Sequence, residues 1–194
     1  MKKSTLIILL FIGVAALAIV VFKFMGEDIK NIEENITENE EDYVIEESIN
    51  DFEECAAAGN AIMESYPRQC FANGETFTEE IGNEVDKNDL IRLDYPRPNA
   101  AISSPLTITG RARGNWFFEA GFPVVLVDWD GLIIAEGSAE AQTDWMTEDF
   151  VPFEAKLEFE NPGVYNNGAL ILQRSNPSDL PENDDALEIP VKFE

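Results

Sequence analysis

The clearest pattern along the chain is a strict alternation of apolar and polar residues in VPFEAKLEFE, which begins at Val151. A strand with one buried face has this period of two, because successive side chains point to opposite faces. The last run, ALEIPVKFE, repeats the pattern, with Leu187 and Ile189 on the apolar face and Pro190 on the other. A proline on the outward face predicts an edge strand.

Further short runs from Leu90 onward complete the pattern. LTITGRA follows an SSP turn at Leu106, GALILQRS precedes the last run, and FPVVLVDWDGLIIAEG holds two apolar runs around Asp130 and Gly131. An Asp-Gly step between two such runs predicts a hairpin. We expect a mainly β fold: a two-sheet antiparallel β-sandwich of seven or eight strands over residues 90–194, with no long helix.

The N-terminal pattern is different, because no charge interrupts the chain from Ser4 to Phe22. As a helix, Thr5–Phe22 would be about 27 Å long at roughly 1.5 Å per residue, close to the hydrocarbon thickness of a bilayer. We predict a transmembrane helix over 5–24 after a cytoplasmic tail, 1–4, because Lys2 and Lys3 favour the cytoplasmic side. The alternative is a cleaved signal peptide, although VVFKFMGED places large residues where a cleavage site needs small ones. The expected location is the cell membrane, single-pass, with the C-terminal domain extracytoplasmic.

Charge sharpens this picture. The chain has 38 acidic and 13 basic residues and no histidine. Residues 1–24 carry a net charge of +3, and residues 25–54 carry −12. We interpret 25–53 as a disordered acidic spacer, because it is too polar to bury a core. The acidity argues against a nucleic-acid partner, and the lack of histidine excludes Ser-His-Asp triads and imidazole-based zinc sites.

Two cysteines, Cys55 and Cys70, lie in a segment rich in turn residues, 54–82. An even cysteine count outside the cytosol favours a disulfide, and closing this loop is worth about 3 kcal/mol in the chain-entropy treatment. A reactive or intermolecular thiol is the alternative. The motif AAGN, then MESYPRQC, then NGETF resembles a short bacterial two-cysteine element found beside other domains in exported proteins.

The sandwich region carries a second resemblance. The motifs SSPLTITGRA, NWFFEAGF, DWM, VPFEAKL and NPSDLPENDD occur in this order. This stretch resembles the immunoglobulin-like domain of bacterial spore germination proteins, a GerM-associated module of the Gmad type. The resemblance implies an extracytoplasmic immunoglobulin-like fold, often in membrane-tethered proteins, and it brings no catalytic residue.

Candidate ligand-binding residues lie near turns. Trp116 follows a glycine loop, where a large aromatic side chain either anchors a partner or fills the core. Glu119 lies inside the same apolar run, so we expect it to be buried with donors from Arg111, Arg113 or the backbone, or else to contact a ligand. Trp145 precedes the strand at Val151 and either packs on the core or meets a partner.

Acidic residues offer two weaker alternatives. Glu148 and Asp149 are adjacent, and neighbours on one strand point to opposite faces, so they do not form a catalytic carboxylate pair by themselves. Asp179, Asp184 and Asp185 lie in an oxygen-rich loop that could hold Ca²⁺, although the EF-hand spacing is missing. The other interpretation of this loop is a solvated turn.

Together these features predict a non-enzymatic protein without a cofactor. The first hypothesis is a membrane-anchored extracytoplasmic immunoglobulin-like module for binding or adhesion at the bacterial cell envelope. Its partners are the membrane, through residues 5–24, and an envelope protein or glycan. This hypothesis predicts an exposed aromatic patch at one end of the sandwich. The alternatives are a structural subunit of an envelope complex, assembled through sheet edges, and a carboxylate-based envelope hydrolase.

Overall fold

The structure is a computed structural model and describes residues 48–194, of which Ile49–Glu194 form one compact unit. The predicted tail 1–4, the transmembrane helix 5–24 and the spacer up to residue 47 lie outside the described residues. No helix among residues 48–194 is long and apolar enough to cross a membrane. The described part is mainly β, with eleven strands in two sheets and only short helices.

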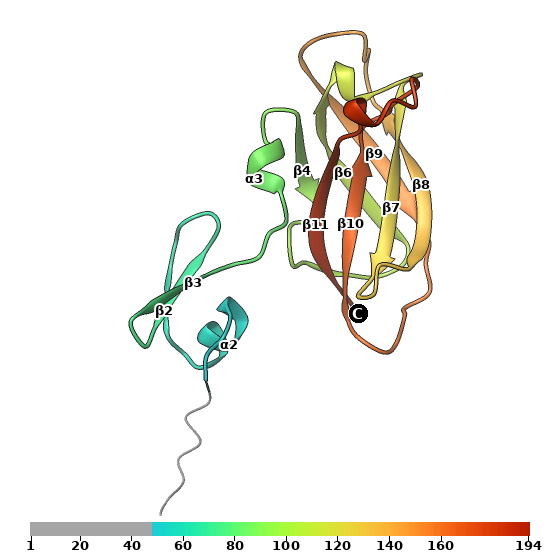
Figure 1. The fold of residues 1–194 in the computed structure, drawn as a ribbon. Helices are drawn as coiled ribbons and strands as arrows, with labels where there is room; N and C mark the ends of the chain where they lie inside the picture. Colours follow the sequence, from blue (N-terminus) through green and yellow to red (C-terminus); the bar gives the residue numbers. More distant parts are fainter. Residues whose placement is uncertain (1–47) are drawn as a thin grey trace, which may run out of the picture. The chain divides into compact units, whose positions relative to one another are not determined.

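The two-cysteine segment has a small sheet and a small core of its own (Figure 1). It begins with helix α2 (Phe52–Ala57), two residues before the predicted boundary at residue 54. Three antiparallel strands follow in the order β1-β2-β3: β1 (Ala61–Met63), β2 (Gln69–Ala72) and β3 (Glu75–Thr78). Asn73 and Gly74 both have positive φ values, 53° and 84°, and form the two-residue turn between β2 and β3.

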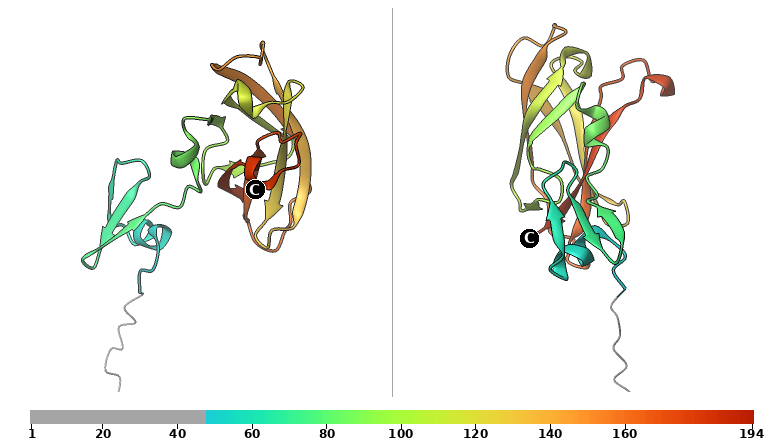
Figure 2. Two further views of the ribbon diagram at one scale, coloured as in Figure 1. Left: turned by 45° about the horizontal axis from the view of Figure 1, so that its top comes forward. Right: turned by 90° about the vertical axis from the view of Figure 1, so that its left-hand side faces the viewer.

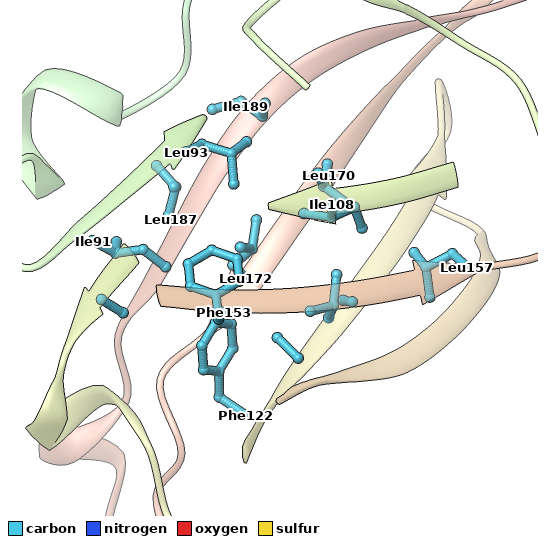
Figure 3. Packing of buried hydrophobic residues seen from close by; sticks show 14 of the residues in the cluster. Ile91, Leu93, Ile108, Phe122, Phe153, Leu157, Leu170, Leu172, Leu187 and Ile189 are labelled. Carbon is cyan, nitrogen blue, oxygen red and sulfur yellow. The ribbon is translucent and has the colours of Figure 1, made fainter. Parts of the chain in front are cut away.

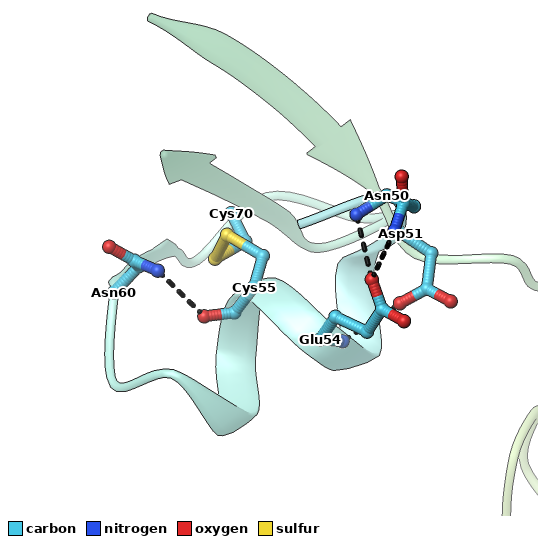
Figure 4. Close-up of a disulfide and its surroundings, with 6 residues drawn as sticks. All are labelled: Asn50, Asp51, Glu54, Cys55, Asn60 and Cys70. Carbon is cyan, nitrogen blue, oxygen red and sulfur yellow. Dashed lines mark hydrogen bonds between the residues drawn. A yellow bond between two sulfur atoms is a disulfide. The ribbon is translucent and has the colours of Figure 1, made fainter. Parts of the chain in front are cut away.

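The predicted disulfide between Cys55 and Cys70 is confirmed (Figure 4). It joins α2 to β2 across a Cα–Cα distance of 6.1 Å, and both cysteines are fully buried. Asp51 caps α2 by accepting a hydrogen bond from the Glu54 backbone N–H at 2.8 Å. Only Phe52 and Ala72 join the two cysteines as buried residues of this core, so the disulfide is its main element.

The larger sheet has eight strands in the order β4-β6-β9-β8-β7-β10-β11-β5 (Figures 1 and 2). Its strands are β4 (Ile91–Tyr95), β5 (Ala101–Ile102), β6 (Leu106–Arg113), β7 (Gly121–Asp128), β8 (Ile133–Ala141), β9 (Phe150–Leu157), β10 (Asn167–Gln173) and β11 (Ala186–Phe193). The short helices are α3 (Glu84–Lys87), η1 (Gly114–Trp116) and η2 (Pro181–Asn183).

The sequence predicted a sandwich of two separate sheets. In the structure, a single hydrogen-bonded sheet of eight strands curves around one hydrophobic core and forms both of its layers. β8 makes this possible because it pairs with β7 along most of its length and with β9 at Glu140 and Ala141. Every strand contact in this sheet is antiparallel except that of β5, which lies parallel to β11. The predicted hairpin at Asp130 and Gly131 is confirmed as the turn between β7 and β8.

The alternating patterns bury the faces that they predict. Figure 3 shows Phe122 and Phe153 pointing into the core between the layers, where their rings meet edge to face at 5.0 Å. The buried residues of β9 are Val151, Phe153, Ala155 and Leu157, and those of β11 are Leu187, Ile189, Val191 and Phe193. The outward Pro190 does not mark an outermost strand, because the two residues of β5 lie beyond β11. Asn83 and Asn99 cover much of that side of β11 by hydrogen bonding to Glu188 and Pro190.

Candidate functional site

Two exposed aromatic side chains meet at one end of the eight-stranded sheet. Trp129 follows β7 directly, and Tyr165 lies in the segment 158–166 before β10. Because β7 and β10 are paired, with Asp128 opposite Gly168, the end of one strand lies beside the start of the other. The two rings pack edge to face with their centroids 4.7 Å apart, while Trp129 remains 50% exposed and Tyr165 53% exposed.

Three exposed aliphatic side chains lie next to these two residues in the sequence. Leu132 and Ile133 belong to the hairpin that carries Trp129, and Val164 precedes Tyr165. Their exposed fractions are 66%, 52% and 75%. We call these five residues, Trp129, Leu132, Ile133, Val164 and Tyr165, the aromatic patch. Clusters of exposed apolar side chains on a soluble domain mark interaction surfaces, whereas single exposed apolar residues need no explanation.

The loops that carry the aromatic patch are held in place by their own polar groups. One carboxylate oxygen of Asp128 accepts hydrogen bonds from the backbone N–H groups of Asp130 and Leu132, at 3.0 and 2.9 Å. Gly131 takes the positive φ of 79° that closes the turn. In the second loop, the Asn161 side chain accepts from Gly163 and donates to the Glu194 carbonyl, at 2.9 and 2.8 Å. The backbone of both loops is therefore fixed by hydrogen bonds within the domain.

The two tryptophans that the sequence singled out lie at the other end of the sheet. Trp116, in η1, is fully buried within the core cluster, so its indole cannot contact a surface ligand in this conformation. Its Nε1 has no hydrogen-bond partner among residues 48–194. Trp145 is partly buried and packs against the same core. Its neighbour Met146 is 75% exposed and does not pack on the core.

The expectation of a buried Glu119 paired with arginines is wrong. Glu119 is exposed and has a φ of 51°, because the chain turns outward after the buried Phe117. Arg111 instead pairs with Asp94, with 3.3 Å between guanidinium nitrogen and carboxylate oxygen. Arg113 donates to the backbone carbonyls of Asp89 and Glu148, both at 3.1 Å.

The acidic candidates are engaged separately. Asp184 accepts a hydrogen bond from the Asn176 amide at 2.7 Å, and Asp185 pairs with Lys87 at 2.5 Å. Asp179 lies in a turn with a φ of 53°. Within residues 48–194, no three His, Cys, Asp or Glu side chains are grouped so that they could hold a metal ion. Glu148 and Asp149 are both exposed, and the Asp149 backbone N–H is bonded to the Thr147 hydroxyl.

The sequence analysis predicted an exposed aromatic patch at one end of the sandwich but did not identify Trp129 or Tyr165 as its members. DWDG was used there only as a hairpin signal, and the two aspartates place Trp129 in the turn without deciding how exposed its ring is. No local signal identifies Tyr165, because its contact with Trp129 depends on the pairing of β7 with β10. The described part is thus a mainly β module with an exposed aromatic pair and a separate disulfide-closed unit.

Comparison with known proteins agrees with this class. Residues 90–179 match the family model described as the immunoglobulin-like domain of bacterial spore germination, Gmad2. The match covers most of the eight-stranded sheet and confirms the resemblance seen in the motifs. Neither the comparison with curated proteins nor that with solved structures found a match.

Proposed function

We propose that the protein is an extracytoplasmic, non-catalytic binding module with an immunoglobulin-like sandwich, held at the cell membrane by residues 5–24. The family match over residues 90–179 supports the fold and the module class. The buried disulfide supports a location outside the cytosol, because such bonds persist in oxidising compartments. The N-terminal hydropathy and lysines support the anchor and its orientation.

The aromatic patch carries the proposal for binding. Each large apolar side chain contributes about 1.5–3 kcal/mol when it is fully buried, and tryptophan and tyrosine dominate the energetics of protein interfaces. The loops under Trp129 and Tyr165 are fixed, so association loses little conformational entropy. Three of the five side chains are aliphatic, which favours an apolar protein surface over a sugar ring as the partner.

Assembly through sheet edges, the structural alternative, is less well supported. β4 is one outer strand of the eight-stranded sheet, and its pairing shifts register between Leu93 and Tyr95. The other outer strand, β5, has only two residues. Irregular and very short edge strands are devices that oppose pairing between molecules.

Photo-crosslinking in intact cells tests the binding proposal. A photoreactive phenylalanine analogue replaces Leu132 in the aromatic patch or, as a matched control, the exposed Met146 at the other end of the sheet. We expect a defined protein adduct from position 132 and none from position 146. The same adducts from both positions, or adducts with lipid alone from position 132, would contradict the proposal.

A protease-protection experiment tests the topology separately. Protease added to intact cells should digest residues 49–194 and leave a small N-terminal fragment in the membrane. Full protection of the chain, with digestion only after lysis, would contradict the proposed orientation without bearing on the patch.

A further inference from the structure

Four of the six arginines of this acidic chain lie on β4, on β6 or just after β4. They are Arg92, Arg97, Arg111 and Arg113. Three of them, all except Arg113, line a cleft of about 510 Å³ together with Tyr66, Glu84 and Asp94. The cleft has no residue in common with the aromatic patch. A concentration of positive charge is unexpected in a chain whose net charge is −25.

Arg92 and Arg111 are direct cross-strand partners on β4 and β6. Both side chains point outward, because their neighbours Ile91, Leu93 and Ala112 are buried. Like charges at directly opposed positions destabilise an antiparallel pair. The register therefore places two like charges on neighbouring strands, an electrostatic cost that an anion bound by both side chains would reduce.

The first guanidinium of the pair is held in place by its surroundings. Nε of Arg92 donates to the Asn88 carbonyl at 2.8 Å, and its guanidinium carbon lies 4.5 Å from the centre of the Phe150 ring. Within residues 48–194, Nε is the only atom of this guanidinium that makes a hydrogen bond, so both terminal nitrogens keep their donors. Arg113 stacks on the same ring at 4.1 Å.

The acidic side chains of the cleft only partly offset this charge. Glu84 is buried and pairs with Arg97 at 2.8 Å. Burial raises the pKa of Glu84, against the opposing effect of Arg97. Its carboxylate oxygens are already engaged by Arg97 and by the Tyr66 hydroxyl. Asp94 approaches Arg111 only to 3.3 Å, and both side chains are about half exposed. Exposed pairs of this kind are weak and give way to a stronger acceptor.

We propose that this cleft binds the phosphate group of an anionic ligand, with Arg92 and Arg111 as the paired donors and Arg97 beside them. Guanidinium groups bind phosphate oxygens through two parallel N–H donors, which matches the terminal nitrogens left free on Arg92. The phosphate belongs either to a small phosphorylated molecule or to a phosphate-bearing polymer outside the membrane. The two sources present the same group to the cleft.

Isothermal titration of the full chain in a non-ionic detergent tests the inference. The probes are inorganic phosphate, glycerol 3-phosphate, a short poly(glycerol phosphate) and, as a carboxylate reference, citrate. The Arg92→Gln/Arg111→Gln variant is compared with Lys156→Gln/Arg174→Gln, which changes the net charge equally at exposed or partly exposed positions outside the cleft. Each lost charge-assisted contact should weaken phosphate binding about tenfold, and the control should stay within about twofold of the unmodified chain.

The Arg92→Lys/Arg111→Lys variant keeps the charge and removes the paired donors, so an intermediate loss of affinity supports the assigned geometry. Much tighter binding of the polymer than of glycerol 3-phosphate identifies the polymer as the source, and equal binding identifies a small molecule. Several results would overturn the inference: no saturable phosphate binding up to about 20 mM, equal losses in the two Gln variants, or tighter binding of citrate than of the phosphate compounds.

Discussion

Reduction of the disulfide should unfold the small N-terminal unit and leave the eight-stranded sheet intact. The bond between Cys55 and Cys70 spans 15 positions, for which loop closure is worth about 3 kcal/mol. Among residues 48–194, the small core holds Phe52 and Ala72 as buried apolar residues beside the cysteines, with Ile49, Ala56 and Phe77 partly buried against it, so modest apolar burial remains once the bond is cut. The large core contains no cysteine and belongs to another cluster. A loss of about 3 kcal/mol raises the opening equilibrium of the small unit more than a hundredfold.

Hydrogen exchange measured by mass spectrometry checks this prediction on the oxidised and reduced chain. Amide protection should fall across α2 and β1 to β3, and peptides from β6 to β11 serve as the internal control. Unchanged protection in α2 and β2 after verified reduction would show that apolar burial alone holds this segment together, and it would refute the main role assigned to the disulfide. Loss of protection throughout the eight-stranded sheet would refute the independence of the two cores.

Three further pairs of substitutions, each a test variant with a matched control, probe packing and electrostatics through urea unfolding. Gly114→Ala should lower the free energy of unfolding by at least about 2 kcal/mol, because its Cβ would lie 1.9 Å from the Thr147 carbonyl oxygen. Gly121→Ala should cost about 1 kcal/mol or less, because its nearest contact, at 2.9 Å, is the Ser138 hydroxyl, which can rotate, and the nearest backbone atom, the Ala139 carbonyl oxygen, is 3.3 Å away. Phe153→Ala should lower the free energy of unfolding by about 3–5 kcal/mol, because this side chain is buried in the core. Phe118→Ala should lower it by less than about 1 kcal/mol, because Phe118 is half exposed. Equal losses in the two variants would contradict the assigned core. A hydrogen bond from the Arg68 guanidinium lowers the pKa of Glu79 in the folded protein. The ionised carboxylate therefore contributes fully to the free energy of unfolding at a pH above its unfolded-state pKa. This contribution is lost as the pH falls through the lower folded-state pKa. Glu79→Gln should flatten this acid-side decline and Glu80→Gln should not; identical pH profiles for the two variants would contradict the role of the pair.

The sequence was sufficient to predict the buried face of the strands in which apolar and polar residues alternate. β9 and β11 bury the predicted faces, because a period of two assigns every side chain once one face is apolar. It was insufficient for the sheet topology. The ladder becomes continuous through the pairing of Glu140 with Glu154, a contact between residues 14 positions apart that no local pattern specifies.

The candidate site shows the same limit. Trp116 and Trp129 both stand beside turns in the sequence, yet the first is fully buried and the second is half exposed. Trp116 lies in η1, where its side chain packs within the core cluster. Trp129 lies in the turn held by Asp128, where its ring remains half exposed. Arg92 and Arg111 likewise face each other only through the register of β4 with β6.

The most direct test of the binding proposal is the crosslink yield from position 132 in two tryptophan variants of the full chain. Trp129→Ala removes the centre of the aromatic patch and should reduce the protein adduct about thirtyfold, as expected for an interface hot spot of about 2 kcal/mol. Trp145→Ala removes a tryptophan at the other end of the sheet and should leave the yield within about twofold. An unchanged yield in Trp129→Ala, or an equal loss in both variants at equal protein levels, would contradict the assignment of the aromatic patch as the binding surface.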